Sequence, residues 1–564
     1  MATDQILDLR WHDVEPRFRD LAARPPTETS IDDWLSEWSS LTARLDEASR
    51  RLEVATTRDT ADTDSRHRYH AFLDEIYPPW QQEEQRLKST LLGTGIEPRG
   101  LEVQLRKMRT DAALYRESNV VLLSQEIKLA ERYASIAGTW SARWDAQDRP
   151  LAKVRPFLQD VDRTQRERAW RVLQIPVLRT RDEIEALWRE VLQIRERLAA
   201  NAGLPDYRAF RWQELKRFDY TPADCKRFNQ AILELVVPVV DRMYQQRRRD
   251  LGIEALRPWD LDVDPRGLAP LRPFAMIDEL LSKTSSVFHH VDPQLGGYFD
   301  TMRREDLLDL DSRLNKAQGG YCLPFNLARR PFIFLSLVGT QGDIVALLHE
   351  GGHAFHVFEM AHLPYVQQRD VEKIGAEFAE VASTAMELLA SPHLSEHSGG
   401  YYSERDASRH IVETLEGYLT GWCWIALVDA FQHWVYEHPD LAADVRLCAD
   451  RYLALYTQYF PSVDCSGLEP EVAAGWLATS HIYQTPFYYI EYGLAQLGAI
   501  QIWANALRDQ ASAAARYRHA LSLGDTRSIP DLFAAAGGKL GFDRATLKPA
   551  VKVVTERMAA LSNR

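Results

Sequence analysis

The stretch His349-Glu350-Gly351-Gly352-His353 places two histidines four residues apart within a run of apolar residues. On a helix, residues i and i+4 lie one above the other on the same face, so both imidazoles can reach one metal ion. Zinc binds such nitrogens at about 2.0–2.1 Å. Glu350 lies beside the first histidine, which suits a general base toward a water held at the metal. We therefore predict one zinc ion (Zn²⁺) per chain at this motif.

The residues around the motif predict a buried helix. The apolar run Ile344–Leu348 precedes it, and Ala354 and Phe355 follow it. Asp343 can cap this helix through its side-chain oxygen. Burying two histidines and a carboxylate is costly unless they have partners, and a metal ion is such a partner. The context therefore favours a metal site over a chance match on a solvated helix.

A catalytic zinc site needs a third protein ligand and an open position for water. The metzincin class takes that ligand from H-E-x-x-H-x-x-G-x-x-H, but here His356 replaces the glycine and Glu359 the last histidine. We therefore expect the class in which a later helix supplies a glutamate. The segment Glu377–Leu389 has the required apolar side, and four polar residues lie near one face of it. These residues are Glu377, Glu380, Ser383 and Glu387.

A second candidate group combines His481 with four tyrosines within ten residues, namely Tyr483, Tyr488, Tyr489 and Tyr492. A phenol is neutral at pH 7 and donates a hydrogen bond, as an imidazole N–H does. Such donors can stabilise the oxyanion that forms when water attacks a carbonyl. Core packing is the alternative, but four buried hydroxyls all need partners. We expect at least one of them to act in catalysis.

These blocks resemble the thimet oligopeptidase and oligoendopeptidase F family of zinc metallopeptidases, and most of all its oligoendopeptidase F branch. The resemblance covers residues 316–492, and the helical remainder is compatible with it. The matching blocks are Lys316–Cys322, Pro331–Phe334, Gly339–Asp343, His349–His356, Phe378–Ser383 and His481–Tyr492.

The resemblance implies a role for each matching residue. His349, His353 and Glu380 match the metal ligands, Glu350 matches the general base, and Glu387 is a helix neighbour behind the ligands. His356 either supports the ligands or packs in the core. Gly319, Gly320 and Tyr321 match an edge strand that pairs with the main chain of an extended substrate. Thr485-Pro486-Phe487 departs from the glycine-tyrosine pair of many relatives, which leaves open which of Tyr483, Tyr488, Tyr489 and Tyr492 is the donor. Of these we expect Tyr492.

Long helical periods and few strand-like runs predict a mainly α protein with one small sheet beside the zinc-binding helices. The resemblance implies two helical lobes that enclose a deep channel. We expect an N-terminal lobe over residues 1–200 and a catalytic lobe over residues 201–564. Strands are expected at Tyr321–Cys322 and Pro331–Val338. Helices are expected at Ile31–Leu52, Leu101–Ala137, Arg181–Ala200, Thr221–Gln246, His410–Glu437 and Ala442–Tyr459.

Composition excludes several classes of partner. The net charge of −13 argues against nucleic acid. No run of 18 apolar residues predicts a membrane helix, and the N-terminal residues lack the pattern of a signal peptide. Five scattered cysteines without a C-x-x-C pair fit free thiols in the cytoplasm. No pattern predicts an oligomeric state.

We therefore predict a zinc-dependent oligopeptidase that cleaves internal bonds of short unfolded peptides. Two alternatives remain. A dipeptidyl carboxypeptidase would use the same ligands together with a cation for the terminal carboxylate, for which Arg329 and Arg330 are two of many candidates. A non-enzymatic helical peptide-binding protein could keep the motif as a relic, but such a protein would have no need of Glu350.

Overall fold

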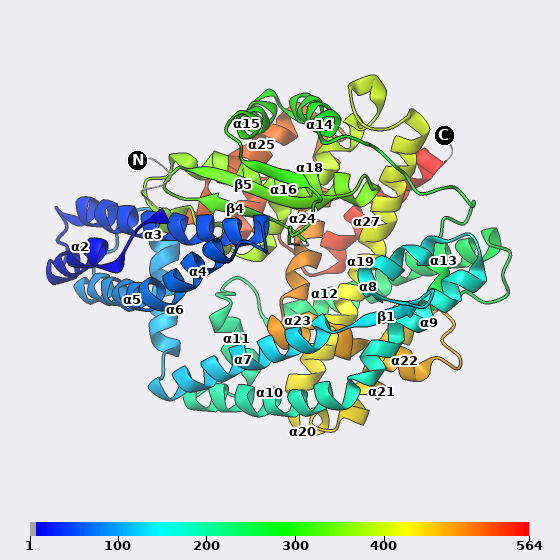
Figure 1. Cartoon of the computed structure of the whole chain (residues 1–564), viewed down its shortest axis with the longest axis horizontal. Coiled ribbons are helices and arrows are strands. Elements are labelled where there is room, and N and C mark those ends of the chain that lie inside the picture. Colours follow the sequence, from blue (N-terminus) through cyan, green and yellow to red (C-terminus); the bar gives the residue numbers. More distant parts are fainter. Residues whose placement is uncertain (1–6, 318, 563–564) are drawn as a thin grey trace.

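The computed structural model describes residues 7–317 and 319–562. Helices make up most of this part of the chain, and the strands form two small sheets (Figure 1). The predicted mainly α architecture is confirmed. Two large hydrophobic cores organise most of the helices, one formed by residues between Leu9 and Met108 with Tyr365 and a larger one that extends from Val54 to Leu561. Two small clusters lie beside them, around Trp144 and around Trp259. The predicted lobe boundary at residue 200 stays a prediction.

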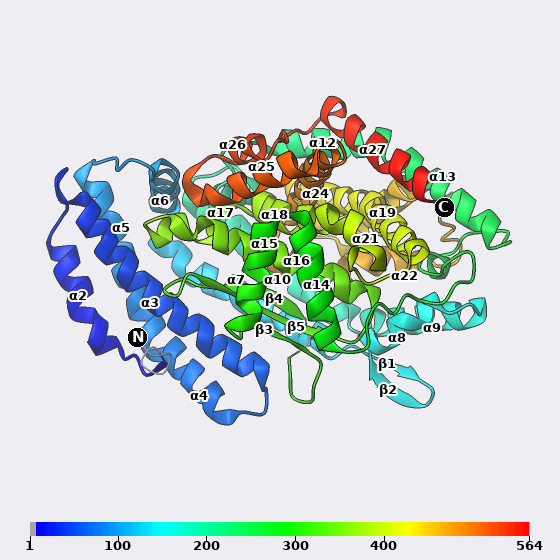
Figure 2. The ribbon, with the colours of Figure 1, turned by 90° about the horizontal axis from the view of Figure 1, so that it is seen from above.

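The first helices form a group at one end of the molecule, seen in blue in Figures 1 and 2. In α3 the apolar residues Trp34, Trp38, Leu41 and Leu45 recur every three to four positions and are buried. The same helix packs against strand β4 and so joins this group to the sheet. The helices of the group are α2 (Trp11–Ala23), α3 (Ile31–Arg58), α4 (Thr63–Ala71), α5 (Tyr77–Thr94) and α6 (Glu102–Leu114).

Most of the next helices pack into the larger core, with α10 against α7, whereas β1, α8 and part of α9 share a small separate cluster. A short antiparallel hairpin of β1 and β2 projects from them. The elements are α7 (Glu117–Gly138), β1 (Ser141–Trp144), β2 (Gln147–Pro150), α8 (Leu151–Val154), α9 (Arg163–Arg179), α10 (Arg181–Ala202), α11 (Tyr207–Glu214), α12 (Pro222–Leu235) and α13 (Val237–Asp250).

A three-stranded sheet and two helices occupy the middle of the sequence. The strand order is β3-β5-β4, so β4 is an edge strand, antiparallel to β5. α16 packs against β5 and β4, and it also packs against the helices α18, α25 and α15. The elements are α14 (Ile277–Val291), α15 (Pro293–Arg304), β3 (Leu308–Asp311), β4 (Gly320–Phe325), β5 (Arg330–Leu337), α16 (Gln341–Glu359), α17 (Val371–Ile374) and α18 (Ala376–Ala390).

The last helices complete the larger core around α18 and α24, which pack against each other. The elements are α19 (Glu404–Glu437), α20 (Pro439–Ala442), α21 (Val445–Tyr459), α22 (Glu469–Ala473), α23 (Ser480–Gln484), α24 (Tyr489–Ala506), α25 (Gln510–Ser522), α26 (Ile529–Ala535) and α27 (Arg544–Ser562).

Two predicted long helices are wrong, because each is a pair. The period over Leu101–Ala137 breaks between α6 and α7, where Tyr115 and Arg116 are extended. The period over Thr221–Gln246 breaks before α13, which carries a proline in its first turn. A proline has no N–H to donate and clashes with the preceding turn, so it starts a new helix there.

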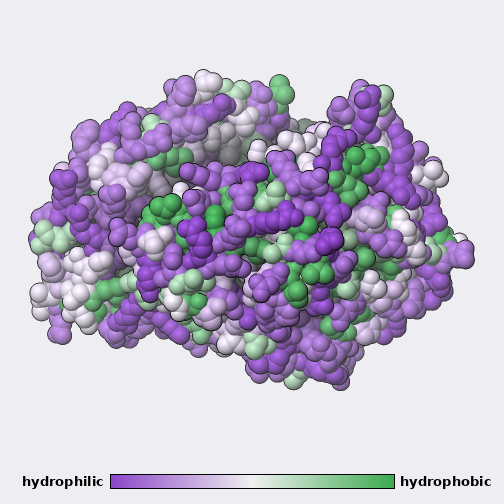
Figure 3. Space-filling view, turned by 90° about the horizontal axis from the view of Figure 1, so that it is seen from below, coloured by the Kyte–Doolittle hydropathy of each residue, from purple (hydrophilic) through white to green (hydrophobic). Residues whose placement is uncertain are grey.

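The face shown in Figure 3 is mostly hydrophilic, with small separate hydrophobic patches. Within residues 7–317 and 319–562, no helix combines the length and apolar character that a membrane crossing requires. All five cysteines carry free thiols.

Candidate metal centre and its surroundings

Helix α16 carries the histidine motif and starts at a capping box. Thr340 is the N-cap residue, and Asp343 accepts hydrogen bonds from the backbone N–H of Thr340 at 2.8 Å and of Val338 at 2.7 Å. Asp343 therefore satisfies free donors at the helix start, but as the third helical residue. The prediction that Asp343 is itself the N-cap residue is wrong, because the N-cap residue is Thr340, three positions earlier.

The two glycines of the motif let α16 approach its neighbours closely. A Cβ at Gly352 would lie 2.4 Å from the carbonyl oxygen of Ala382 and 2.6 Å from the Cα of Ser383 in α18. A Cβ at Gly351 would lie 2.7 Å from the ring of Phe288. Glycine costs about 1 kcal/mol in a helix relative to alanine. Here it allows backbone contact between α16 and α18, which brings the acidic residues of α18 to the histidines.

Three potential ligand atoms meet between these helices. The Nε2 atoms of His349 and His353 lie 3.3 and 3.7 Å from Oε2 of Glu380. One ligand atom from each of the three residues lies within 4.8 Å of the other two. Atoms held at about 2.0–2.1 Å by a tetrahedral zinc are about 3.3–3.4 Å apart. The donor set and its spacing thus fit a zinc ion.

Charge and hydrogen bonding keep Glu380 ionised. Burial raises the pKa of its carboxyl, but the hydrogen bond from His349 and the charge of His353 lower the pKa to about 2. Ser383 Oγ also donates to Oε2 of Glu380 at 3.1 Å. The residue is therefore an anion at neutral pH, as a metal ligand requires.

A second carboxylate orients the first histidine. The Nδ1–H of His349 donates to Oε1 of Glu387 at 2.7 Å, and Tyr418 in α19 donates to Oε2 of the same residue at 2.8 Å. A carboxylate behind a histidine ligand fixes its ring and tautomer. Sequence reasoning missed Tyr418, because it lies in a long buried helix with no motif around it.

Glu350 projects from the same helix into a partly buried position. Burial raises the pKa of its carboxyl to about 7, against the opposing charge of His349. The side chain of Cys322 in β4 is close enough to Glu350 to feel its charge. Burial, and to a smaller extent this charge, raise the pKa of the Cys322 thiol. Successive side chains of a strand point to opposite faces. Cys322 thus lies on the face of β4 that is turned toward Glu350, and the edge strand lies beside the candidate base.

Two other residues of the motif region face elsewhere. Glu377 is buried and accepts a hydrogen bond from the Tyr220 hydroxyl, so it is not part of the histidine cluster. His356 is fully buried against the ring of Phe378, and within the described part of the chain neither ring nitrogen has a hydrogen-bond partner. Its surroundings match the packed-core alternative.

The predicted edge strand begins with two glycines that the structure requires. Gly319 has φ +104°, in the region that favours glycine, and a Cβ at Gly320 would lie 2.3 Å from the Leu335 side chain. The Tyr321 ring stacks on Phe334, and its hydroxyl meets Thr57 of α3. The side chain of Tyr321 thus contacts α3 of the N-terminal helices, whereas its main chain lies at the edge of the sheet.

His481 and three of the tyrosines form one aromatic cluster. Ring centroids of Tyr488, Tyr489 and Tyr492 lie 5.9, 4.7 and 6.2 Å from that of His481. Burial, and then the charge of Glu380, raise the pKa of Tyr492 to about 12 and the pKa of Tyr488 further. Both phenols are therefore neutral, and both are close enough to Glu380 to feel its charge. Tyr483 lies apart in the core, stacked on Tyr133 at 4.2 Å.

The comparison with protein families agrees with this arrangement. The model of "Peptidase family M3" matches residues 157–550, which is most of the chain. The chain belongs to peptidase family M3. It is therefore a peptidase, and its metallopeptidase character follows from the family. The predicted resemblance is confirmed.

Solved structures extend the likeness of this M3 peptidase over its whole length. PZ peptidase A with an inhibitor is 23% identical with a TM-score of 0.85, and the match covers 99% of both chains. A structure assigned as an oligoendopeptidase F is 25% identical with a TM-score of 0.85, and the match covers 98% of this chain and 97% of the other. Oligoendopeptidase F from Enterococcus faecium is 16% identical with a TM-score of 0.62 and 99% coverage of both chains. A search among curated proteins gave no match.

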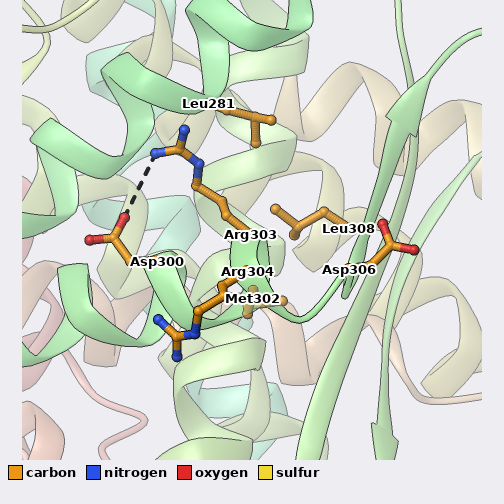
Figure 4. Close-up of a pocket in the computed structure, with 7 residues that line it drawn as sticks. All are labelled: Leu281, Asp300, Met302, Arg303, Arg304, Asp306 and Leu308. Carbon is orange, nitrogen blue, oxygen red and sulfur yellow. Dashed lines mark ion pairs between the residues drawn. The ribbon is translucent and has the colours of Figure 1, made fainter.

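A pocket of about 530 Å³ opens elsewhere on the M3 peptidase (Figure 4). It is formed by α14, α15 and the start of β3, and Arg303 forms an ion pair with Asp300 one turn earlier in α15. None of its lining residues belongs to the metal centre or the aromatic cluster. They are Leu281, Asp300, Met302, Arg303, Arg304, Asp306 and Leu308.

Proposed function

We propose that this M3 peptidase is a zinc-dependent oligoendopeptidase that hydrolyses internal bonds of short unfolded peptides. The observation that carries the proposal is the meeting of two imidazole nitrogens and one carboxylate oxygen beside Glu350 and the edge of β4. His349, His353 and Glu380 would hold one zinc ion per chain. A zinc ion bound there would act as a Lewis acid, which lowers the pKa of water and polarises a carbonyl.

Glu350 would take the proton from the attacking water. Its raised pKa of about 7 places it near the range in which a carboxylate both accepts and returns a proton at neutral pH. The same carboxyl would then give that proton to the leaving amine. Its position one residue after His349 keeps it beside the metal but outside the ligand set.

Hydroxyl groups of the aromatic cluster would stabilise the oxygen that becomes negative during attack. Tyr492 is the preferred donor, with His481 as its partner and Tyr488 and Tyr489 as alternatives. The neutral phenols near Glu380 support this role, because a donor must carry its proton at neutral pH.

The free edge of β4 would bind the substrate as an added strand. Main-chain pairing along Gly319, Gly320 and Tyr321 needs an extended peptide, which a folded protein rarely offers away from its ends. Two helical lobes around a channel would further restrict entry. We expect no nucleic-acid or membrane partner, and the five free cysteines support a cytoplasmic location.

A map of cleavage products tests this proposal. Peptides of about 5–20 residues, each residue spanning about 3.3 Å when extended, and one folded globular protein are incubated with the zinc-loaded chain. Mass spectrometry should show internal cuts in the peptides and an intact folded protein, with no cuts by Glu350→Gln. Stepwise loss of carboxyl-terminal dipeptides alone would instead establish the dipeptidyl carboxypeptidase alternative. Efficient digestion of the folded protein would refute the restricted entry.

A further inference from the structure

Three arginines bind the main chain of the segment Ile482–Phe487 from helices that lie far earlier in the sequence. Arg195 of α10 donates to the carbonyls of residues 482 and 483 at 2.9 and 2.8 Å. Arg211 of α11 donates to the carbonyl of residue 486 at 3.3 Å. Arg217, which follows α11, donates to the carbonyl of residue 487. Four carbonyls of one short segment thus accept bonds from charged donors, which are stronger than neutral ones.

The arginines are themselves held in fixed positions. Arg195 is fully buried, and its guanidinium also donates to Glu126 and to Tyr436, each at 2.7 Å. The buried side chain of Arg217 also donates to Glu491 in the first turn of α24. A guanidinium presents its donors in a rigid planar fork. These arginines therefore set the place of the segment and the start of α24 together.

The end of the segment has an unusual conformation that its surroundings maintain. Phe487 has φ +65°, the left-handed region that side-chain-bearing residues rarely adopt. Its ring is fully buried and lies 5.5 Å from the ring of Trp212, and its N–H donates to Gln432 at 2.8 Å. Such a conformation persists only where neighbouring contacts determine it.

This segment joins two parts of the aromatic cluster. His481 comes directly before it and Tyr488 directly after it, with their rings 5.9 Å apart. We propose that Arg195, Arg211 and Arg217 are positioning residues that fix His481 and the tyrosines of α24 relative to the metal centre. The inference rests on the proposed function, in which these groups stabilise the developing negative charge. The arginines act through the segment and touch no reacting atom.

A matched pair of arginines on α11 separates this role from simple stability. Arg208 and Arg211 are both 17% exposed, and each forms an ion pair with a glutamate, Glu437 or Glu214. Only Arg211 also binds the segment. Arg208→Met and Arg211→Met thus remove the same charge, but only the second releases a carbonyl between His481 and Tyr488.

The experiment compares both variants in the full-length, zinc-loaded chain. A displacement of about 1 Å can cost about 10²-fold in rate. Because Arg211 makes one of four contacts, we expect its kcat to fall about tenfold with little change in KM, whereas Arg208→Met keeps its kcat. Hydrogen exchange of a peptide covering residues 481–492 should rise in Arg211→Met only. Arg211→Lys, which keeps the charge and one donor group, should recover part of the kcat.

A double variant links the effect to the donors. In a Tyr492→Phe background, Arg211→Met should lower kcat much less than tenfold, because groups that act together are non-additive. Equal kcat and exchange for Arg211→Met and Arg208→Met would overturn the inference, whatever the donors do. Full activity of Tyr492→Phe, Tyr488→Phe and His481→Gln, with raised exchange in Arg211→Met, would instead refute the donor roles and leave the main-chain contacts standing.

Discussion

The side chains of the metal centre and those of the neighbouring aromatic cluster are positioned in different ways. In the metal centre, α16 and α18 bring His349, His353 and Glu380 together through helical spacing and one close backbone contact at Gly352. In the aromatic cluster, the end of the short helix α23 and the non-helical residues 485–487 connect His481 to Tyr488, and distant arginines hold this connection. Regular elements thus position the proposed ligands locally, whereas the proposed donors depend on tertiary contacts.

This difference predicts how each region responds to change. A ligand is lost when its own side chain is removed, because the helix that carries it remains. The donors of the aromatic cluster can be displaced by variants far away in the sequence, since arginines from distant elements hold the short connection between α23 and α24. The following variants test the two halves of this comparison in order of expected effect.

His353→Ala removes one imidazole from the metal centre and should have the largest effect. Two remaining protein ligands do not complete a catalytic zinc site, so most of the bound metal and all measurable peptidase activity should be lost. Metal analysis of the purified protein and a peptide assay measure both quantities. Retained stoichiometric zinc would show that this histidine is no ligand.

Glu350→Gln keeps the shape of the side chain and removes the proton acceptor. The variant should bind one zinc per chain and lose activity by about 10²–10⁴-fold, the usual contribution of general acid–base catalysis. Zinc analysis and kcat of the same preparation give the answer. Near-normal turnover would contradict the role of Glu350 and leave the ligand set untouched.

Tyr492→Phe removes one hydroxyl from the aromatic cluster. Loss of one oxyanion donor typically lowers kcat by about 10²–10³-fold, with KM little changed. Steady-state kinetics of the Phe variants at residues 488, 489 and 492 should rank Tyr492 first. A defect in KM alone would indicate substrate binding, and a larger kcat defect at one of the other two would transfer the role to it.

Gly352→Ala should have the smallest effect and act on stability. The added Cβ meets backbone at 2.4 Å, and overpacking typically costs about 1–3 kcal/mol. Gly351→Ala is the matched control, because its Cβ meets the end of the Phe288 ring, which can shift. Thermal unfolding should therefore show a lower midpoint for Gly352→Ala than for Gly351→Ala. Equal midpoints would mean that the helix contact is adjustable.

The sequence predicted the mainly α fold class and a candidate metal site at His349, His353 and Glu380, but not the details of the elements around it. Helical spacing paired the two histidines, but it left three glutamates open on the later helix, and only the family resemblance selected Glu380 and Glu387. Spacing could not show that Glu377 contacts Tyr220. Helical periods cannot show where a long apolar pattern breaks, so α6 and α7 were predicted as one helix. The strands β1, β2 and β3 have four residues each, too few for a pattern of alternation to be recognised.

Contacts between residues far apart in the sequence could not be predicted from sequence patterns. Tyr418 meets Glu387 across two helices, and Arg195 lies in a helix with the ordinary amphipathic pattern. The glycine pair of the motif was the one visible signal, since adjacent glycines inside a helix suggest a close approach. Residues whose role depends on tertiary packing were thus found only in the structure.

Zinc binding by two matched variants of α18 tests the central claim most directly. Glu380→Gln and Glu377→Gln each replace a carboxylate by an amide of the same shape on the same helix. Titration of the metal-depleted proteins with zinc against a competing chelator should show tight one-to-one binding for the parent and Glu377→Gln, and much weaker binding for Glu380→Gln. Unchanged zinc affinity in Glu380→Gln, with loss in Glu377→Gln, would contradict the proposed ligand set.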